Sequence, residues 1–389
     1  MASSAATLAE AAPAARPALS EAPRQVPYVA LGQQFEAEAA SLVPRLQGVL
    51  ASGQWVAGPE VAELEGKLAA RLGARDCIAV GSGTDALILS LRALGIGPGD
   101  EVITAPNSFI ATASAIVHVG ATPVFADVLP DQNIDPRRVE AAITARTRAI
   151  LPVHLTGRAA RMPELLDLAR RHGLKVIEDA AQAVDARLGG QAAGTFGDLG
   201  CFSCHPLKNL NAAGDAGFIL ANDVELAQRL RRARSNGLVD RETALEWGVV
   251  SRLDSLQAAV LLERLPKLDA VTEARRRNAE AYRKLLAWVP QVFMPPCRAE
   301  EYNVFHTFVV QVERRDELQE FLRERGIGTA IHYKIPIHLQ PAARSLGYGV
   351  GSFSVAEEQA KRILSLPVNQ FLSAADVEHV AAAIKEFYA

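Results

Sequence analysis

With 389 residues, of which 49% are apolar and 22% are charged, the chain is long enough for two domains and a large core. The formal net charge is -3 at pH 7 with acidic and basic residues interspersed, which excludes a basic surface for nucleic acid or anionic membranes. No apolar run approaches the roughly 20 residues of a membrane span and no secretory signal is visible, so we expect a cytoplasmic protein that acts on small molecules.

The first part of the chain reads as a tail followed by an alternation of strands and helices. Residues 1–26 are rich in Ala, Pro and Ser without a helical period, and we predict a mobile tail there. Apolar spacing then predicts helices at Glu60–Leu72, Thr84–Leu94, Ile110–Val119, Pro136–Thr144 and Met162–His172. Short apolar runs predict strands at Cys77–Val80, Glu101–Ala105, Pro123–Ala126, Ala149–Val153, Lys175–Glu178, Leu199–Ser203 and Gly217–Leu220.

This alternation is typical of the α/β class. We expect a mostly parallel seven-stranded sheet with helices on both faces and ligands at the carboxyl ends of the strands. We place this large domain at residues 27–265 and a smaller α+β domain at residues 266–389. The elements predicted toward and within the second domain are helices at Val224–Ser235, Arg252–Leu286 (interrupted at Pro266), Arg315–Arg325 and Ala374–Phe387, and strands at His306–Val312 and Ala330–His332.

The segment GSGTDAL, residues 81–87, lies between a predicted strand and a predicted helix. Glycines let the backbone approach an anion, and the free amides of a helix N-terminus, with the hydroxyls of Ser82 and Thr84, can hold a phosphate. The segment is neither a dinucleotide GxGxxG motif nor a P-loop. An ordinary turn between strand and helix is the alternative interpretation.

Two further segments follow predicted strands. In PNSFIAT, residues 106–112, Phe109 can lie flat on a planar cofactor ring or fill the core. In VIEDAAQA, residues 176–183, Asp179 closes an apolar strand at the edge of the sheet where ligands bind. A carboxylate there can pair with a protonated ring nitrogen, or it can cap a helix that starts at Ala180.

The segment GCFSCHPLKNLNAAGDAG, residues 200–217, combines the hydroxyl of Ser203 with Lys208 in a polar loop. A lysine that reacts with an aldehyde must become a neutral amine, and because its ordinary pKa is ~10.4, burial or a nearby charge has to lower that pKa. A surface lysine in a turn is the alternative.

Cysteine spacing raises a separate question, because Cys201 and Cys204 form a CxxC next to His205. A zinc site needs a second pair, and a redox CxxC usually opens a helix, whereas residues three apart in a strand point to opposite faces. We therefore predict free buried thiols for all four cysteines, Cys77 and Cys297 included, and no metal.

A phosphate cradle, a ring stacker, a carboxylate for a pyridinium and a lysine for an aldehyde together indicate pyridoxal 5'-phosphate (PLP). The chain resembles the fold-type I (aspartate aminotransferase-like) PLP enzymes and, more narrowly, the DegT/DnrJ/EryC1/StrS family of sugar aminotransferases. The resemblance runs from about Tyr28 to the end of the chain. The segments that carry it are WVAGPEVAELE (55–65), SGTDAL (82–87), GDEVITAPNSFIATASAI (99–116), EDAAQA (178–183), GDLGCFSCHPLKNL (197–210), SRLDSLQAA (251–259) and IHYKIPIHLQPA (331–342).

The resemblance assigns roles to individual residues. It implies that Lys208 forms the internal aldimine and transfers protons, and that Asp179 keeps the pyridine nitrogen protonated. The remaining cofactor contacts that it implies are Phe109 on the ring, Gln182 near the ring hydroxyl, Gly83, Thr84 and Ser203 on the phosphate, and Asn236 on the phosphate of the second subunit. The last contact implies a homodimer with shared sites. His205, His332 and Tyr333 would face the sugar substrate, and a purely structural role is the alternative for each histidine.

The sequence departs from the family pattern in two places. Val184 and Asp185 follow EDAAQA where histidine and glycine are common, and the G-x-N-x-R motif has lost its asparagine in residues 248–252. Both changes lie outside the cofactor set and concern the sugar pocket. A branch of the family replaces the lysine with histidine and performs dehydration, and Lys208 argues against that branch.

The resemblance implies transfer of an amino group from L-glutamate to a keto sugar linked to a nucleoside diphosphate. In IHYKIPIHL, residues 331–339, Lys334 and His338 join His332 and Tyr333 as groups suited to sugar hydroxyls and a diphosphate. No carboxylate-binding arginine can be assigned in the C-terminal domain. The alternatives are an aminotransferase for a keto-cyclitol or keto-sugar phosphate in aminoglycoside-type biosynthesis, and a non-catalytic PLP-binding sensor.

Overall fold

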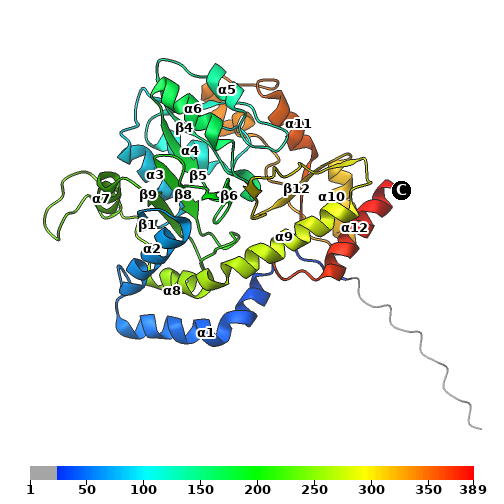
Figure 1. Ribbon diagram of the computed structural model, residues 1–389, viewed down its shortest axis with the longest axis horizontal. Helices are drawn as coiled ribbons and strands as arrows, with labels where there is room; N and C mark the ends of the chain where they lie inside the picture. Colours follow the sequence, from blue (N-terminus) through cyan, green and yellow to red (C-terminus); the bar gives the residue numbers. More distant parts are fainter. Residues whose placement is uncertain (1–23) are drawn as a thin grey trace, which may run out of the picture.

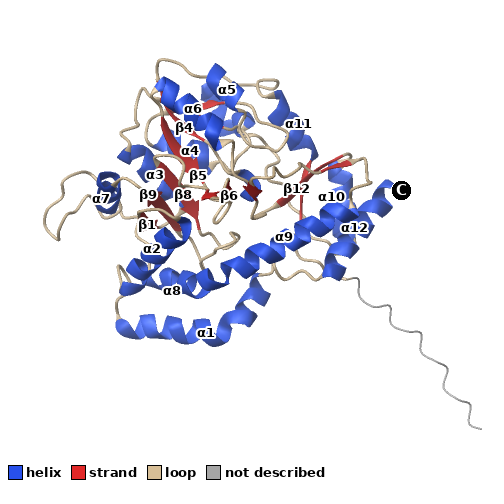
Figure 2. Cartoon of the chain, viewed as in Figure 1, coloured by secondary structure: helices blue, strands red, loops and turns tan. Residues whose placement is uncertain are grey.

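The computed structural model describes residues 24–389, and a seven-stranded sheet forms its centre (Figures 1 and 2). The strand order is β1-β9-β8-β5-β4-β2-β3. The strands are β1 Asp76–Val80, β2 Glu101–Thr104, β3 Thr122–Phe125, β4 Thr147–Leu151, β5 Lys175–Asp179, β8 Leu199–Ser203 and β9 Gly217–Ala221. Every predicted strand of this sheet is present close to its predicted bounds.

The sheet is parallel from β3 to β8, and β9 runs antiparallel to both of its neighbours. No helix separates β8 from β9, so the chain returns directly through the loop that carries Lys208. Parallel strands are buried on both faces, which explains their nearly continuous apolar runs. The predicted α/β class is therefore confirmed.

Helices cover both faces of the sheet, as predicted. One face is covered by α3 (Gly83–Ala93), α4 (Ala111–His118) and α7 (Val224–Ala233). The other is covered by α2 (Pro59–Leu72) and α8 (Ser255–Arg264) at one end, and by α5 (Pro136–Ala141) and α6 (Met162–His172) at the other.

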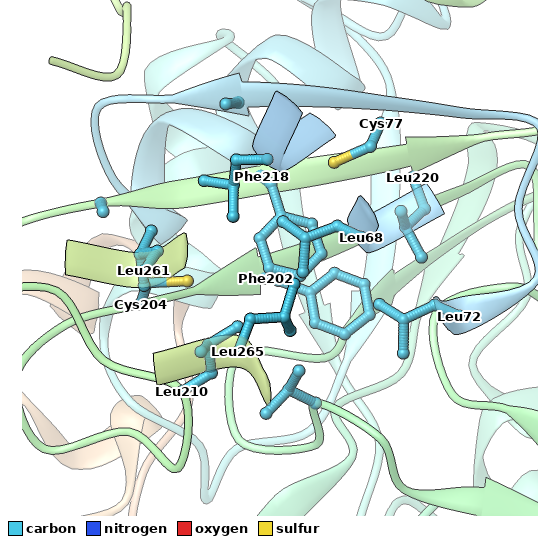
Figure 3. Packing of buried hydrophobic residues seen from close by; sticks show 14 of the residues in the cluster. Leu68, Leu72, Cys77, Phe202, Cys204, Leu210, Phe218, Leu220, Leu261 and Leu265 are labelled. Carbon is cyan, nitrogen blue, oxygen red and sulfur yellow. The ribbon is translucent and has the colours of Figure 1, made fainter. Parts of the chain in front are cut away.

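Aromatic side chains of the two antiparallel strands fill the core under α2 and α8. The rings of Phe202 and Phe218 stack with centroids 4.4 Å apart and an interplanar angle of 7°. Leu68 and Leu72 of α2 and Leu261 of α8 surround them (Figure 3). Because buried aromatic and leucine side chains dominate core stability, this cluster holds β8 and β9, and with them the loop between them, against the helices.

The helical stretch predicted at Arg252–Leu286 is α8, a short 3₁₀ turn at Leu265–Lys267 and α9 (Leu268–Leu285), so the interruption at Pro266 is confirmed. α9 carries the chain to a second, smaller sheet of order β10-β12-β13 (Figure 1). The elements of this part are β10 Val292–Phe293, β12 Phe308–Val312, α10 Arg315–Glu324, α11 Ser354–Arg362, β13 Ile363–Leu366 and α12 Ala374–Tyr388. The helices α9, α10 and α12 and this sheet enclose a core of their own.

Some elements were not predicted. The long helix α1 (Leu31–Ser52) lies beside α8, and α11, β13 and the two-residue strands β10, β6 (Arg187–Leu188), β7 (Gln191–Ala192) and β11 (Glu301–Tyr302) were also missed. The strand predicted at Ala330–His332 is wrong. Only Ala330 pairs, with Ser365, and the chain then turns at His332 toward the edge of the large sheet.

Of the tail predicted at residues 1–26, the first 23 residues lie outside the described part. At its end Val26 is fully buried and bridges to Ile327. In the part of the chain that the structure describes, no helix has both the length and the apolar character needed to span a bilayer.

Candidate active site

A cavity of about 330 Å³ opens at the carboxyl end of the large sheet, between it and the residues that follow α9. All the predicted site residues except Lys334, His338 and Asn236 line this cavity. They are Gly83, Thr84, Phe109, Asp179, Gln182, Ser203, His205, Lys208, His332 and Tyr333. Segments up to 250 residues apart in the sequence thus converge at the edge where an α/β sheet binds ligands.

The N-terminus of α3 forms one wall of the cavity. The Ser82 hydroxyl caps the helix by accepting a hydrogen bond from the Asp85 N–H at 3.1 Å, which leaves the N–H groups of Gly83 and Thr84 for an anion. A Cβ atom on Gly83 would lie 2.7 Å from the Ser203 Cβ, and one on Gly217 would lie 2.5 Å from the Ser82 carbonyl. The glycines therefore let the N-terminus of α3 approach the ends of β8 and β9 closely. The Ser203 hydroxyl consequently lies close enough to this helix end to contact the same phosphate.

Ser251 supports this wall from behind. Its hydroxyl donates to an Asp85 carboxylate oxygen at 2.8 Å and accepts from the Gly81 N–H at 3.1 Å. Ser251 belongs to the segment that departs from the family motif, and the missing asparagine position is Val250, which is exposed and lies outside the cavity. At the other departure, Asp185 adopts a positive φ of 68°, the conformation that glycine accepts most easily, and Arg71 holds its carboxylate.

Asp179 ends β5 and is 4% exposed. One carboxylate oxygen accepts from the Thr112 hydroxyl at 2.8 Å and the other from the Ala181 N–H at 3.1 Å. Burial raises the pKa of Asp179, while these hydrogen bonds and the charge of Lys208 oppose the rise. No helix begins at Ala180, where the described chain makes a turn, so the helix-cap alternative for Asp179 does not hold.

Phe109 is 55% exposed and lies 5.7 Å from the Tyr333 ring, so it is not a core residue. The side chain of Gln182 links Tyr333 to the backbone of Thr156. It accepts from the Thr156 N–H at 2.7 Å and donates to the Tyr333 hydroxyl at 3.3 Å. A planar ring bound here could contact the aromatic face of Phe109 and the side-chain amide of Gln182.

Lys208 lies in the loop between β8 and β9, with its N–H bonded to the His205 carbonyl at 2.8 Å. Burial lowers the pKa of Lys208 to about 8, and the Asp179 carboxylate opposes this shift. Near neutral pH an appreciable fraction of the amine is therefore neutral and able to attack an aldehyde. The alternative of an ordinary surface lysine does not fit this environment.

The cysteines of the CxxC segment point to different cores. Cys201 contacts the Ser90 hydroxyl under α3, and Cys204 lies in the cluster under α2 and α8. Burial raises the pKa of Cys204 to about 12, which makes it an inert thiol. The prediction of a buried thiol is wrong for Cys297, which is exposed near Arg158 and Arg283 because it follows two prolines in an irregular surface segment.

His332 lies where the chain turns into the cavity. Its Nδ1 is 2.8 Å from the Ser365 hydroxyl and its ring stacks 6.0 Å from that of Tyr28. Burial lowers the pKa of His332 to about 4, so the imidazole is neutral. His205 also lines the cavity but is exposed.

Two groups proposed for the substrate do not reach the cavity. His338 is buried against Glu357 at 3.1 Å because residues 337–339 form a 3₁₀ turn that faces α11. Lys334 points to solvent near Asp316, 3.8 Å away. Asn236, exposed at the end of α7 with a φ of 60°, lies outside the cavity of its own chain.

The cavity also contains residues that the sequence did not reveal. They are Tyr28, Asp215, Arg275, His306, Thr307 and Asn369. Most come from the helix α9 or from irregular segments of the smaller part of the chain, where no glycine-rich turn or strand end marks them. No local pattern distinguishes Arg275 from the other charged residues of α9, because the buried face of this helix also includes Thr272 and Asn278.

The donor set fits pyridoxal 5'-phosphate. The N-terminus of α3 offers N–H groups to a phosphate, Phe109 a ring surface, Asp179 a buried carboxylate and Lys208 an amine of lowered pKa, all in one cavity.

Comparison with known proteins gave concordant results. The model of the DegT/DnrJ/EryC1/StrS aminotransferase family matches residues 36–385. A "Pleiotropic regulatory protein" of Geobacillus stearothermophilus is 43% identical over 93% of this chain and 98% of its own length. A dTDP-3-amino-3,4,6-trideoxy-alpha-D-glucose transaminase of Streptomyces venezuelae is 42% identical over 95% of this chain and 97% of its own. The crystal structure of S. venezuelae DesV in complex with a ketimine intermediate superposes with a TM-score of 0.92 at 42% identity, covering 94% of this chain and 98% of that one.

Proposed function

We propose, since this chain belongs to the DegT/DnrJ/EryC1/StrS aminotransferase family, that it moves an amino group from L-glutamate to a keto sugar carried on a nucleoside diphosphate. The observation that carries the proposal is the cavity that joins Lys208, Asp179 and the cradle of α3. The transaminase of S. venezuelae, named for a dTDP-linked amino sugar, matches this chain over nearly its whole length and supports the substrate class.

Pyridoxal 5'-phosphate would supply an aldehyde that bonds amines and a ring that withdraws electrons when its nitrogen is protonated. Gly83, Thr84 and Ser203 would hold its phosphate, and Phe109 would lie on its ring. Lys208 would bond the aldehyde. Asp179 would face the ring nitrogen. Burial removes the water that would otherwise stabilise its carboxylate, and a proton on the ring nitrogen would supply a compensating positive charge.

Lys208 has the properties of the acid and base for the reaction. With its pKa lowered by burial to about 8, the amine of Lys208 would accept a proton from the carbon of the amino donor and later give it up. Because the same cavity must hold the donor and then the sugar, the two substrates bind in turn. The neutral imidazole of His332 and the hydroxyl of Tyr333 are available to sugar hydroxyls.

A homodimer with shared sites belongs to this proposal. The loop after α7 extends away from the body of the chain and exposes Leu245, Trp247 and Val250, with Trp247 96% exposed (Figure 1). Exposed large apolar side chains of this kind favour an interface. A second copy seated there would bring its Asn236 toward the phosphate of this chain's cofactor.

The test is a pair of half-reactions. The purified yellow protein should lose its aldehyde absorbance with glutamate and regain it with a dTDP-linked or UDP-linked keto sugar. A keto-cyclitol turned over more than tenfold faster in kcat/KM would favour the cyclitol alternative. If protein that binds the cofactor carries out neither half-reaction, the result would favour the non-catalytic sensor. The G. stearothermophilus relative is named a regulatory protein, which agrees with that alternative.

A further inference from the structure

Arg275 is a buried cation in the wall of the cavity with hydrogen-bonding capacity that the described chain leaves unused. It lies on α9 and is 8% exposed. Its Nη1 donates to the Phe305 carbonyl at 3.3 Å and to the His306 carbonyl at 3.1 Å, and its Nη2 donates to the Gln370 side chain at 3.3 Å. The Nε–H has no partner among residues 24–389.

The unused donors of Arg275 belong to two nitrogens of the guanidinium, Nε and Nη2. An arginine has five N–H donors in a fixed fork, and the bonds above use three. One donor remains on Nε and one on Nη2, and these two nitrogens form an edge with which an arginine binds a carboxylate through two parallel hydrogen bonds. Arg275 thus keeps a bidentate edge free, while its other edge is fixed to backbone carbonyls.

The charge of Arg275 is also uncompensated. No carboxylate among the described residues lies within ion-pair distance of it. Tyr28 and His306 are the titratable groups that face it. Burial raises the pKa of Tyr28 to about 12 and holds that of His306 well below its usual value, so both are neutral near pH 7. An isolated buried cation is unfavourable unless a ligand supplies the opposite charge.

Arg275 lies close to the reacting end of the cavity. His306, Lys208 and Arg275 line the same cavity of about 330 Å³, and the His306 carbonyl accepts from Arg275 at 3.1 Å. A ligand that bridges Lys208 and Arg275 is therefore compact. Glutamate fits this description because both of its carboxylates lie within a few bonds of its amine.

We propose that Arg275 binds a carboxylate of the amino donor. The inference rests on the proposed function and adds the residue that selects a carboxylate-bearing donor over other amines. A carboxylate matches the free edge in shape and neutralises the single charge of Arg275, whereas a nucleoside diphosphate brings at least two negative charges to one guanidinium. This arginine in the C-terminal part is the one that the sequence did not identify.

Arg276 provides a matched control. It is the next residue of α9 and also donates to a backbone carbonyl, that of Asn303, at 2.8 Å, but it stacks on Tyr302 outside the cavity. Arg275→Gln and Arg275→Lys are compared with Arg276→Gln in the cofactor-loaded enzyme. Circular dichroism and cofactor absorbance check that each variant is folded.

The first measurement is calorimetric binding of glutarate, a dicarboxylate without an amine. Loss of a charge-assisted bidentate pair should weaken binding roughly tenfold to a hundredfold in Arg275→Gln. Arg275→Lys keeps the charge but not the fork, so it should fall between Arg275→Gln and wild type. Arg276→Gln should bind like wild type, and the affinity for the nucleoside diphosphate should not change in any variant.

The second measurement distinguishes the two carboxylates of the donor. The rate of absorbance loss is compared for glutamate and for norvaline, which lacks the side-chain carboxylate. If Arg275 binds the side-chain carboxylate, Arg275→Gln loses the preference for glutamate; if it binds the α-carboxylate, both rates fall together. Either result supports the inference.

Two outcomes overturn the inference. One is glutarate binding at wild-type strength in folded Arg275→Gln, or in folded Arg275→Lys if the Gln variant does not fold. The other is a loss of nucleoside diphosphate affinity with glutarate binding intact. A wild-type enzyme that reacts with no amino acid refutes the proposed function instead, so the two failures are distinct.

Discussion

Replacing Asp179 by alanine tests the electrostatic basis of the proposed chemistry. The carboxylate is 4% exposed, accepts two hydrogen bonds and faces the cavity that contains Lys208. Removing one partner of a buried, hydrogen-bonded ion pair costs about 3–5 kcal/mol. At about 1.4 kcal/mol for each factor of ten, a loss felt fully in the transition state slows the reaction by roughly two to four orders of magnitude.

The assay is the single-turnover loss of aldehyde absorbance with saturating glutamate, followed across pH. Asp179 also raises the pKa of Lys208, so its removal should shift the rising, acid limb of the pH profile to lower pH in addition to lowering the rate. A second variant, Asp179→Asn, keeps the shape and at least one hydrogen bond with Thr112 or Ala181 but not the charge, and it should be slow as well.

The reasoning is refuted by an Asp179→Ala enzyme within tenfold of wild type and with an unmoved pH profile. A slow Ala variant beside a normal Asn variant would mean that Asp179 acts by its hydrogen bonds to Thr112 and Ala181 rather than by its charge.

Three further predictions concern Lys208 and Asn236. Borohydride treatment of the yellow protein should fix the cofactor to Lys208, and peptide mapping that places the label on another lysine contradicts the assignment. Because burial lowers the pKa of Lys208 to about 8, the neutral amine fraction grows as pH rises to that value, so capture of the aldehyde by cofactor-free protein should accelerate about tenfold per pH unit below 8 and level off above it; a rate that keeps rising to pH 10 would indicate an ordinary lysine. Mixing Lys208→Ala chains with Asn236→Ala chains should restore part of the activity, since some heterodimers carry both defects in one site and neither in the other. Mixtures that never exceed the parents despite proven subunit exchange would place the whole site within one chain.

The sequence predicted those site residues that sit beside a strand end. Asp179, Ser203 and Phe109 each follow an apolar run, and the geometry of a parallel sheet brings such positions together whatever the details of the packing. The cradle at Gly83 was predictable for the same reason, because a glycine turn that opens a helix has a recognisable composition.

Other parts depended on tertiary contacts that leave no local pattern. Arg275 looks like any charged residue of an amphipathic helix until α9 is placed against the carbonyls of Phe305 and His306. His338 lies in the same motif as His332, yet a 3₁₀ turn directs it away from the cavity and into the packing around α11. The helix α1 was missed although it runs for 22 residues, because Pro44 inside it is a breaker signal that the contacts with α8 override.

The loop that carries Lys208 is closed at its base by paired strands: Ser203 is opposite Gly217, and the Cys204 N–H bonds to the Ala216 carbonyl. The groups assigned to the cofactor come from this loop and from neighbouring strand ends, whereas Arg275, His306, His332 and Tyr333 reach the cavity from the other part of the chain. On the proposed assignments, the groups of the chemical step and those that choose the substrate therefore come from different stretches of sequence, with His205 as the exception. Exchanging residues 266–369 with those of a relative should change which substrates are accepted, while the amino-transfer reaction stays the same.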